Sequence, residues 1–171
     1  MYNILISGYY GFNNIGDESI LRTVIDNLRE KLPQVDITVL SQSPAQTAEK
    51  YGVKAAARMN PWAILRSVRR CDMLLSGGGS LLQDATYGRS ILYYLFILRL
   101  AQLMGKRTFI YSQGIGPIFS ARNRRFTAFV LRRTDGIVVR DSKSRDLLLE
   151  LGVPDHLIHV TADPVILSLI H

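Results

Sequence analysis

The feature that most constrains the fold of this chain is an alternation of short apolar runs with stretches of helical periodicity. Six runs have the length and the apolar, β-branched composition of strands that are buried on both faces. A seventh and weaker run, VKAAA, follows Gly52. We therefore predict strands over residues 2–7, 36–41, 72–76, 107–112, 136–140 and 158–161.

Helical patterns fill the intervals between these runs. Asp141 stands where an N-cap residue is expected, and Gly152 stands where a helix would end. Strands that are separated by helices pair in parallel, so the sequence predicts one α/β domain over residues 1–171, with helices on both faces of a parallel sheet. The expected helices cover residues 17–32, 45–51, 61–70, 89–104, 121–133 and 141–151.

Composition places the chain among globular proteins of a reducing compartment. Of its 171 residues, 47% are hydrophobic and 20% are charged, which suits a domain with a real core and not a disordered segment. Cys71 is the only cysteine, so no disulfide can form within the chain. The start at Met1 has no basic region of the kind that opens a signal peptide, and we expect a cytoplasmic protein.

The most apolar segment, Ile91 to Met104, has two interpretations. It is shorter than the ~20 residues of a membrane span and is interrupted by Arg99. It is either a helix buried in the core or a helix that lies on a membrane surface.

The net charge of +7 is concentrated in the second half of the chain. Between Arg99 and Arg145 there are eleven Lys or Arg residues and two acids, Asp135 and Asp141. This basic stretch is either a solvated helix face or a surface for an anionic ligand or anionic lipid. We expect no nucleic-acid partner, since no helix-turn-helix, zinc or aromatic-platform pattern accompanies the charge.

Four of the predicted strands are followed by polar or glycine-rich loops. In a parallel sheet these loops emerge at one edge, where open α/β sheets bind their ligands. The sequence therefore predicts a single ligand site built from residues 8–18, 77–84, 113–117 and 141–144.

The first of these loops has the spacing of a phosphate-binding loop but the wrong charges. Gly11 and Gly16 are five residues apart, yet Asp17 and Glu18 follow where such a loop has Lys and Ser or Thr. The glycine pattern of a dinucleotide-binding loop is also absent. Asparagine and carboxylate groups suit hydroxyl-rich ligands such as sugars, and a carboxylate can accept a hydroxyl proton. The alternative is that both acids only cap a helix.

Each remaining loop also has a functional and a structural interpretation. The three glycines Gly77, Gly78 and Gly79 can expose backbone N–H groups to an anion, or can simply form a turn with positive φ. Gln113 can donate to and accept from a ligand, or can belong to a turn that enters a helix. Arg140 can direct a cation into the site, or can form a structural ion pair.

Five motifs in this order resemble the amino-terminal half of the bacterial polysaccharide pyruvyltransferases. They are GYYGFNNIGDESIL, LLSGGGSLLQD, YSQGIGP, VVRDSKS and TADP. The resemblance extends over nearly the whole chain and is strongest to the enzymes that pyruvylate cell-wall polymers for surface-layer anchoring. The chain departs from the family's GNxGDE motif at Asn14, which stands in place of a glycine.

The resemblance implies a two-domain, GT-B-like enzyme in which each half is Rossmann-like. Such enzymes transfer a pyruvyl group from phosphoenolpyruvate to two hydroxyls of a sugar, typically the 4- and 6-hydroxyls of N-acetylmannosamine, and form a cyclic ketal. The acceptor is carried on a lipid pyrophosphate, and no metal or organic cofactor is implied. The second, donor-binding domain would be missing from these 171 residues, so we expect this chain alone to be inactive.

The resemblance also assigns roles to individual residues. Asp17 is the candidate base, and Arg140 is the candidate cation for phosphoenolpyruvate or the leaving phosphate. The predicted substrate-binding residues are Gly8, Asn14, Gly16, Glu18, Gly77, Gly78, Gly79, Gln83, Asp84, Gln113, Gly114, Asp141 and Ser142.

Two alternatives remain beside the pyruvyltransferase hypothesis. One is a stand-alone α/β module that holds a glycan without chemistry, and the other is a glycosyltransferase-like enzyme that uses a nucleotide sugar. If the acceptor is lipid-linked, the basic stretch gains a purpose as peripheral contact with an anionic inner leaflet. The arginines expected to make it are Arg122, Arg124, Arg125, Arg132 and Arg133.

Overall fold

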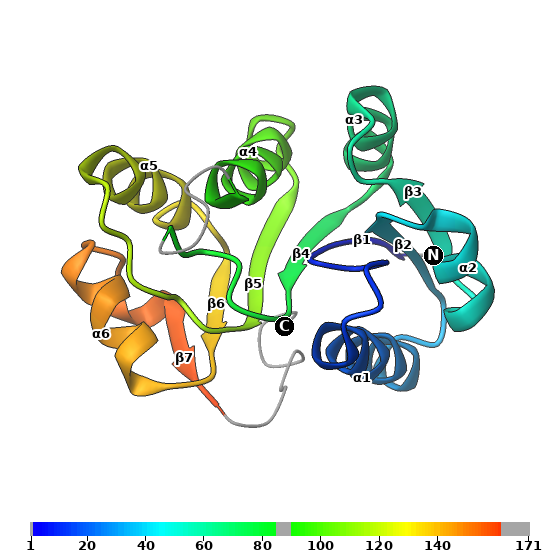
Figure 1. Cartoon of the computed structure of the whole chain (residues 1–171), viewed down its shortest axis with the longest axis horizontal. Coiled ribbons are helices and arrows are strands. Elements are labelled where there is room, and N and C mark those ends of the chain that lie inside the picture. The colour runs from blue at the N-terminus through cyan, green and yellow to red at the C-terminus, as the bar shows by residue number, and fades with distance from the viewer. Residues whose placement is uncertain (1, 85–89, 162–171) are drawn as a thin grey trace.

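The computed structural model describes residues 2–84 and 90–161, which form a parallel sheet between two layers of helices (Figure 1). The strand order is β3-β2-β1-β4-β5-β6-β7, and all neighbouring pairs are parallel. The predicted Rossmann-like α/β class is therefore confirmed. The strands are β1 (Tyr2–Ser7), β2 (Val35–Ser41), β3 (Lys54–Ala57), β4 (Met73–Gly77), β5 (Arg107–Gln113), β6 (Gly136–Val139) and β7 (Ile158–Val160).

The helices divide between the two faces because the strand order reverses between β3 and β4. Connections that run from β1 to β3 place their helices on one face, and those that run from β3 to β7 place theirs on the other, as right-handed crossovers require. The first face has α1 (Ile15–Lys31) and α2 (Pro44–Tyr51). The second has α3 (Pro61–Arg70), α4 (Ser90–Leu103), α5 (Ala121–Leu131) and α6 (Ser142–Glu150).

Each strand feeds two hydrophobic cores because its side chains alternate between faces. In β1, Ile4 and Ile6 pack with Leu21 and Leu28 of α1, whereas Leu5 packs on the opposite face with helices α3 to α6. All three of these strand residues are buried. The near-continuous apolar strands of the sequence are thus explained by burial on both sides.

The apolar segment from Ile91 to Met104 is mainly a core helix. Six residues of α4 are buried against the sheet, which favours the first of its two interpretations, but Phe96 and Leu103 remain exposed. Among residues 2–84 and 90–161, no helix is both long and apolar enough to cross a membrane.

The predicted boundaries agree closely with the observed ones. The weak VKAAA run is a true strand, β3, and Gly152 adopts the left-handed φ of +74° just after α6. Arg140 and Thr161 were predicted within strands but follow them. Arg89, predicted to open α4, and residues 162–164 of the TADP motif lie outside the described residues.

Candidate functional site

The four predicted loops meet at one edge of the sheet. They follow β1, β4, β5 and β6, which are neighbours in the sheet, and hydrogen bonds join them. The N–H of Gly114 donates to the carbonyl of Gly79 at 3.1 Å, and that of Gly116 donates to Leu82 at 3.2 Å. The Arg140 guanidinium donates to Ser80 Oγ at 2.9 Å. The sequence prediction that these segments share one rim is confirmed.

The loop after β1 is fixed by a buried tyrosine. Tyr10 is fully buried and donates its hydroxyl proton to the carbonyl oxygen of Gly77 at 2.6 Å. Burial, with the nearby Asp17 carboxylate, raises the pKa of Tyr10, so the hydroxyl stays a donor. A Cβ at Gly8 would lie 2.3 Å from the Tyr10 ring and 2.5 Å from the Gly77 carbonyl oxygen, so this close crossing of the two loops requires glycine.

Asp17 lies in the first turn of α1 and faces the glycine loop after β4. A Cβ at Gly79 would lie 2.6 Å from Asp17 Oδ1, and Gly79 has a φ of +65°. Asn14 caps α1 by accepting from the N–H groups of Gly16 and Asp17. This cap sets where the helix begins and therefore which way the Asp17 side chain points.

The electrostatics of Asp17 suit a group that exchanges protons. Partial burial raises the pKa of the carboxyl group, and the adjacent Glu18 carboxylate raises it further. The positive charge of Arg140 acts in the opposite direction and favours the ionised form. Asp17 is thus a partly buried carboxyl group under the electrostatic influence of a cation.

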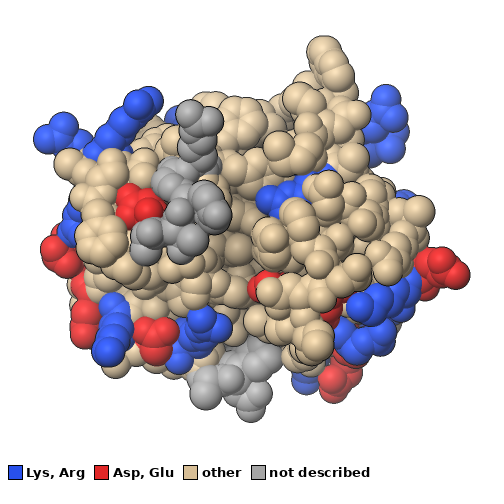
Figure 2. Space-filling view, in the orientation of Figure 1, with Lys and Arg blue, Asp and Glu red and all other residues tan. Residues whose placement is uncertain are grey.

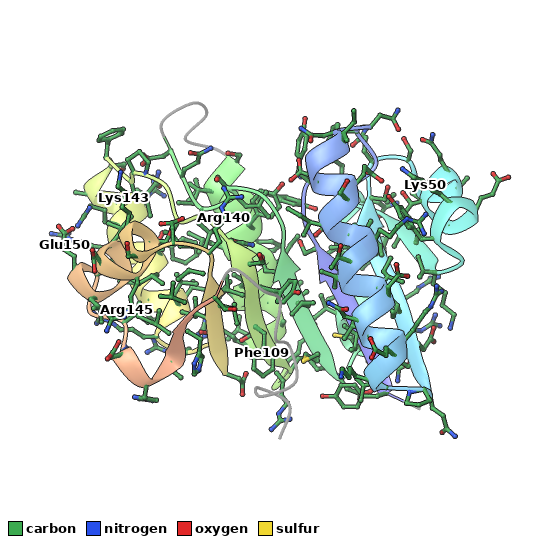
Figure 3. The ribbon with its side chains drawn as sticks, turned by 90° about the horizontal axis from the view of Figure 1, so that it is seen from below. Lys50, Phe109, Arg140, Lys143, Arg145 and Glu150 are labelled. Atoms are coloured by element: carbon green, nitrogen blue, oxygen red, sulfur yellow. The ribbon has the colours of Figure 1, made fainter. Side chains whose placement is uncertain are left out.

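Arg140 lies immediately after β6, between α6 and the strands β4 and β5 (Figure 3). The Cβ of a side chain at Gly114 would lie 2.9 Å from an Arg140 guanidinium nitrogen and 2.9 Å from Ser80 Oγ, so glycine leaves room for this pair. Within the described residues, no salt bridge of Arg140 is present, which disfavours the structural ion pair considered from the sequence. Its guanidinium keeps donors for an anionic ligand.

Glu18 points away from Asp17 and ties the first loop to α2. Its carboxylate accepts from the Gly11 N–H at 2.9 Å, from Lys50 Nζ at 3.3 Å and from the Tyr51 hydroxyl. Burial opposes ionisation of Glu18, but these hydrogen bonds outweigh burial and lower its pKa. The Glu18 oxygens already accept hydrogen bonds that stabilise the loop. The contact of Glu18 with a sugar therefore stays a prediction.

Asp84 likewise has a structural role. Its carboxylate accepts from the N–H groups of Phe119 and Ser120, at 2.7 and 3.0 Å, and from the Asn123 amide at 3.0 Å. These bonds outweigh the effect of burial and lower the pKa of Asp84. Asp84 thereby holds the end of the glycine loop against the start of α5. Gln83, beside it, packs against Gly116.

The other predicted residues also lie at this edge. Gly78 has a φ of +83°, but its N–H donates to the Tyr111 carbonyl, so one N–H of the expected anion nest is used within the fold. Gln113 is fully buried and donates to Ser76 Oγ at 3.0 Å, while its Oε1 has no partner in the described part of the chain. Asp141 caps α6 at the Ser144 N–H, and Ser142 opens that helix in an exposed position.

Sequence analysis missed a buried cation beside the first loop. Arg58 follows β3 and is only 7% exposed, and its guanidinium lies over four aromatic rings at 4.7 to 5.7 Å. It donates to the Gly8 carbonyl at 3.4 Å and to the Tyr94 hydroxyl at 3.3 Å. The rings belong to Tyr9, Phe12, Tyr93 and Tyr94.

This cluster shapes the loop that carries the candidate site. Tyr9 and Phe12 stack with ring centroids 4.0 Å apart, and each is 38% exposed. The aromatic residues of the loop were visible in the sequence, but Arg58 follows a four-residue strand with no motif. Only the placement of β3 two strands from β1 brings it to Gly8.

The chemistry available at this rim is that of acid–base and anion-binding groups. In residues 2–84 and 90–161, no group of three or more His, Cys, Asp or Glu side chains is arranged to hold a metal ion. The rim instead combines a carboxylate of raised pKa, a guanidinium and glycine-lined backbone. Such a set can take a proton from a hydroxyl and stabilise a carboxylate or phosphate.

Solved structures with a similar fold include a complex with UDP, a putative epimerase and a glycosyltransferase. The Anabaena protein Alr3699/HepE, in complex with UDP, aligns at a TM-score of 0.58 with 13% identity, over 94% of this chain and 43% of that chain. A putative UDP-N-acetylglucosamine 2-epimerase from Listeria monocytogenes aligns at 0.59 with 13% identity, over 94% and 44%. A glycosyltransferase from Rickettsia africae aligns at 0.53 with 10% identity, over 93% and 42%.

These comparisons establish the fold and the extent of the chain relative to those proteins. The chain spans less than half of the length of each of them. No curated protein matches the sequence. The family model of the polysaccharide pyruvyl transferases, in contrast, matches residues 14–171, which include the described loops of the rim from Asn14 onward. The chain therefore belongs to the polysaccharide pyruvyl transferase family.

Proposed function

We propose that this chain forms the acceptor-binding part of an enzyme that transfers a pyruvyl group from phosphoenolpyruvate to a cell-wall saccharide. The observation that carries the proposal is that Asp17 faces Gly79 while Arg140 donates to the adjacent Ser80, so both reach the glycine loop after β4. Burial raises the pKa of Asp17, and the Arg140 charge opposes that increase. Membership of the family supports transfer to a polysaccharide. The donor and the ketal product are part of the proposal.

The reaction requires two carbon–oxygen bonds to form at one carbon. One sugar hydroxyl oxygen attacks C2 of phosphoenolpyruvate as its methylene carbon gains a proton, and the carbon–oxygen bond to phosphate then breaks. A second hydroxyl attacks the same carbon and closes the cyclic ketal. The two hydroxyl protons end on the new methyl group and on the released inorganic phosphate.

The residues of the rim can divide these tasks. Asp17 in its ionised form accepts a hydroxyl proton, and Arg140 stabilises the donor carboxylate or the leaving phosphate. Gly79 leaves room for the Asp17 carboxylate beside the glycine loop. Three features hold the loops in place: the helix cap at Asn14, the hydrogen bonds of Asp84 and the aromatic cluster around Arg58.

The proposed partners follow from this chemistry. The saccharide is carried on a lipid pyrophosphate, and the protein works at the cytoplasmic face of the membrane. A second domain supplies the other wall of the cleft and most of the donor site. We expect these 171 residues alone to show negligible turnover, and a measurable rate of pyruvate transfer by this chain alone would contradict that expectation.

The test is an assay of the whole enzyme with phosphoenolpyruvate and a lipid-linked disaccharide that contains N-acetylmannosamine. We predict that Arg140→Ala lowers acceptor-dependent phosphate release about a hundredfold or more, because the anion loses its cation. Mass spectrometry of the acceptor checks that a pyruvyl group was added. Full activity of Arg140→Ala would contradict the assignment of Arg140 as the cation that stabilises the donor carboxylate or the leaving phosphate.

The matched control is Arg145→Ala in α6. Arg145 pairs with Asp155 at 2.8 Å on the surface, so its removal should leave the rate unchanged. Circular dichroism and thermal unfolding establish that both variants are folded.

The same assay separates the two alternatives. The Anabaena neighbour was solved with UDP, but at 13% identity it shares only the fold with this chain. Turnover with UDP-glucose and none with phosphoenolpyruvate would favour a glycosyltransferase-like enzyme. Tight binding of the disaccharide by an enzyme that shows no turnover of either donor would favour a glycan-binding module.

A further inference from the structure

Three neighbouring helices on one face of the sheet contain no acidic residue. Helices α3, α4 and α5 have no Asp or Glu anywhere in their sequences, and each contains arginine. The other three helices all contain acids. These acids are Asp17, Glu18, Asp26, Glu30, Glu49, Asp146 and Glu150.

Each acid-free helix presents large apolar side chains to solvent. Trp62 of α3 is 77% exposed, Phe96 and Leu103 of α4 are 57% and 67% exposed, and Phe129 of α5 is 41% exposed. Exposed apolar side chains that recur on adjacent helices point to an interaction surface.

The exposed apolar residues share their helix faces with arginines. In α3, Arg66, Arg69 and Arg70 follow Trp62 at helical spacing, and a shallow hollow of about 430 Å³ lies between Trp62, Leu65 and these guanidinium groups. In α4, Arg99 lies between Phe96 and Leu103 on one stripe. In α5, Arg122 and Arg125 precede Phe129 on one stripe.

A contact between Arg99 and Phe129 joins the stripes of α4 and α5, and α3 lies next to α4 (Figure 1). The Arg99 guanidinium lies 4.9 Å from the centroid of the Phe129 ring, and that of Arg133 lies 4.1 Å from it. In Figure 2, basic side chains project at both ends of the upper edge of the molecule, over α5 and over α3. We call this surface the α3–α5 face. It is defined by Trp62, Arg66, Arg69, Arg70, Phe96, Arg99, Leu103, Arg122, Arg125, Phe129 and Arg133.

Two of the arginines first expected to attract a membrane are engaged elsewhere. Arg124 pairs with Glu150 at 2.7 Å, and Arg132 donates to the Leu151 carbonyl at 2.7 Å. Both therefore hold α5 to α6. Of that basic stretch, Arg122, Arg125 and Arg133 remain for the α3–α5 face.

We infer that the α3–α5 face docks on an anionic lipid bilayer. The apolar side chains would enter the headgroup region, while the guanidinium groups pair with lipid phosphates. A basic face that lacks acids repels a second copy of itself, whereas an anionic bilayer complements both its charge and its apolar side chains.

The α3–α5 face also borders the candidate site. In a parallel α/β fold the helices begin at the carboxyl edge of the sheet, and Trp62 lies in the first turn of α3. Phe119, just before α5, is 76% exposed at the same edge. The link to a lipid-linked acceptor rests on the proposed function, but the docking surface itself does not.

Trp62 is the only tryptophan of the chain, so its fluorescence reports on this face directly. We expect vesicles of phosphatidylglycerol and phosphatidylcholine to shift its emission to the blue and to bring it within reach of quenching brominated lipids. Vesicles of phosphatidylcholine alone should do neither, and salt should reverse the binding. No blue shift with the anionic vesicles, or an equal shift with both kinds, would overturn the inference.

Two charge-matched triple variants test the position of the surface. Arg66→Gln/Arg69→Gln/Arg70→Gln should weaken partitioning about tenfold or more, because three basic residues leave the bilayer surface. Arg22→Gln/Lys31→Gln/Arg145→Gln removes the same charge from α1 and from the surface of α6, and should have little effect. Equal effects would show that only net charge matters and would overturn the inference.

A third variant separates insertion from charge. Phe96→Ser/Leu103→Ser keeps every charge and should weaken binding to the anionic vesicles. Self-association through this face without lipid, measured by analytical ultracentrifugation, would assign it to a second copy instead. Since the vesicles contain no saccharide, failure here leaves the proposed pyruvyl transfer untouched.

Discussion

At the residue scale, the candidate site depends on the partly buried carboxyl group of Asp17. Asp17 lies against Gly79 and next to Glu18, and both burial and the like charge raise its pKa. Glu18 has the opposite fate, since hydrogen bonds from Tyr51, Gly11 and Lys50 lower its pKa. Two adjacent acids in the sequence thus differ in role because their side chains leave different sides of α1.

The titration of Asp17 is directly measurable in the isolated chain. We predict by carbon-13 NMR that its carboxyl group titrates above the ordinary value of 3.8. Arg140→Gln should raise that pKa further, because it removes the positive charge that favours the ionised form. Arg145→Gln, farther along α6, should leave it unchanged. Titration of Asp17 at or below the ordinary value would remove its claim to be the base.

At the element scale, hydrogen bonds to polar side chains fix the loops that follow the strands. Asp84 joins the loop after β4 to the start of α5, and Ser144 of α6 accepts from the Ile115 N–H at 2.9 Å. Each bond links segments that are far apart in the sequence. The rim is therefore supported by the helices behind it, as a preorganised site requires.

The Asp84 clamp has a predictable pH signature. Its pKa is lowered in the folded state, so its stabilising effect is present at neutral pH and is lost as the pH falls through that lowered value. We predict that Asp84→Ala reduces the free energy of unfolding in urea by about 2 kcal/mol at pH 7.

The difference between Asp84→Ala and the wild type should shrink as the pH is lowered toward 3. Asp146→Ala, in α6, removes a carboxylate that has no hydrogen bond or ion pair within the described part of the chain, and should cost much less. An Asp84→Ala deficit that persists unchanged at low pH would mean that the clamp does not depend on ionisation.

Elements were more predictable from the sequence than side-chain partners were. The strand runs and helical periods predicted all seven strands and all six α-helices within the described residues, because hydrophobic periodicity is local, but not the short 3-10 helix Asp155–Leu157. The edge that gathers the four loops also followed, since parallel strands all end on one side. The partners of Glu18 and Asp84 did not follow, because they depend on which helix lies behind each loop.

At the scale of the whole molecule, the strand order determines contacts that could not be predicted from the sequence. The sequence contains no signal that β3 lies two strands from β1, and so none that Arg58 reaches Gly8. The same order places α3, α4 and α5 side by side and gathers their arginines onto one face. The sequence reveals the basic stretch from Arg99 in α4 to Arg145, but not its continuation over α3.

The central claim is that the four loops form one working site around Asp17. Gly79→Ala tests it most directly, with Gly105→Ala as its match. Both glycines have a left-handed φ, +65° and +67°, so each alanine strains the backbone by about 1 kcal/mol. Only at Gly79 does the new Cβ meet Asp17 Oδ1, at 2.6 Å, whereas at Gly105 nothing lies within 4 Å.

The measurement is phosphoenolpyruvate-dependent pyruvyl transfer by these two variants of the whole enzyme. We predict that Gly79→Ala loses about a hundredfold in rate, because the displaced carboxylate no longer reaches the acceptor hydroxyl, while Gly105→Ala keeps the wild-type rate. Equal rates for two folded variants would contradict the claim that Asp17 and the glycine loop act together.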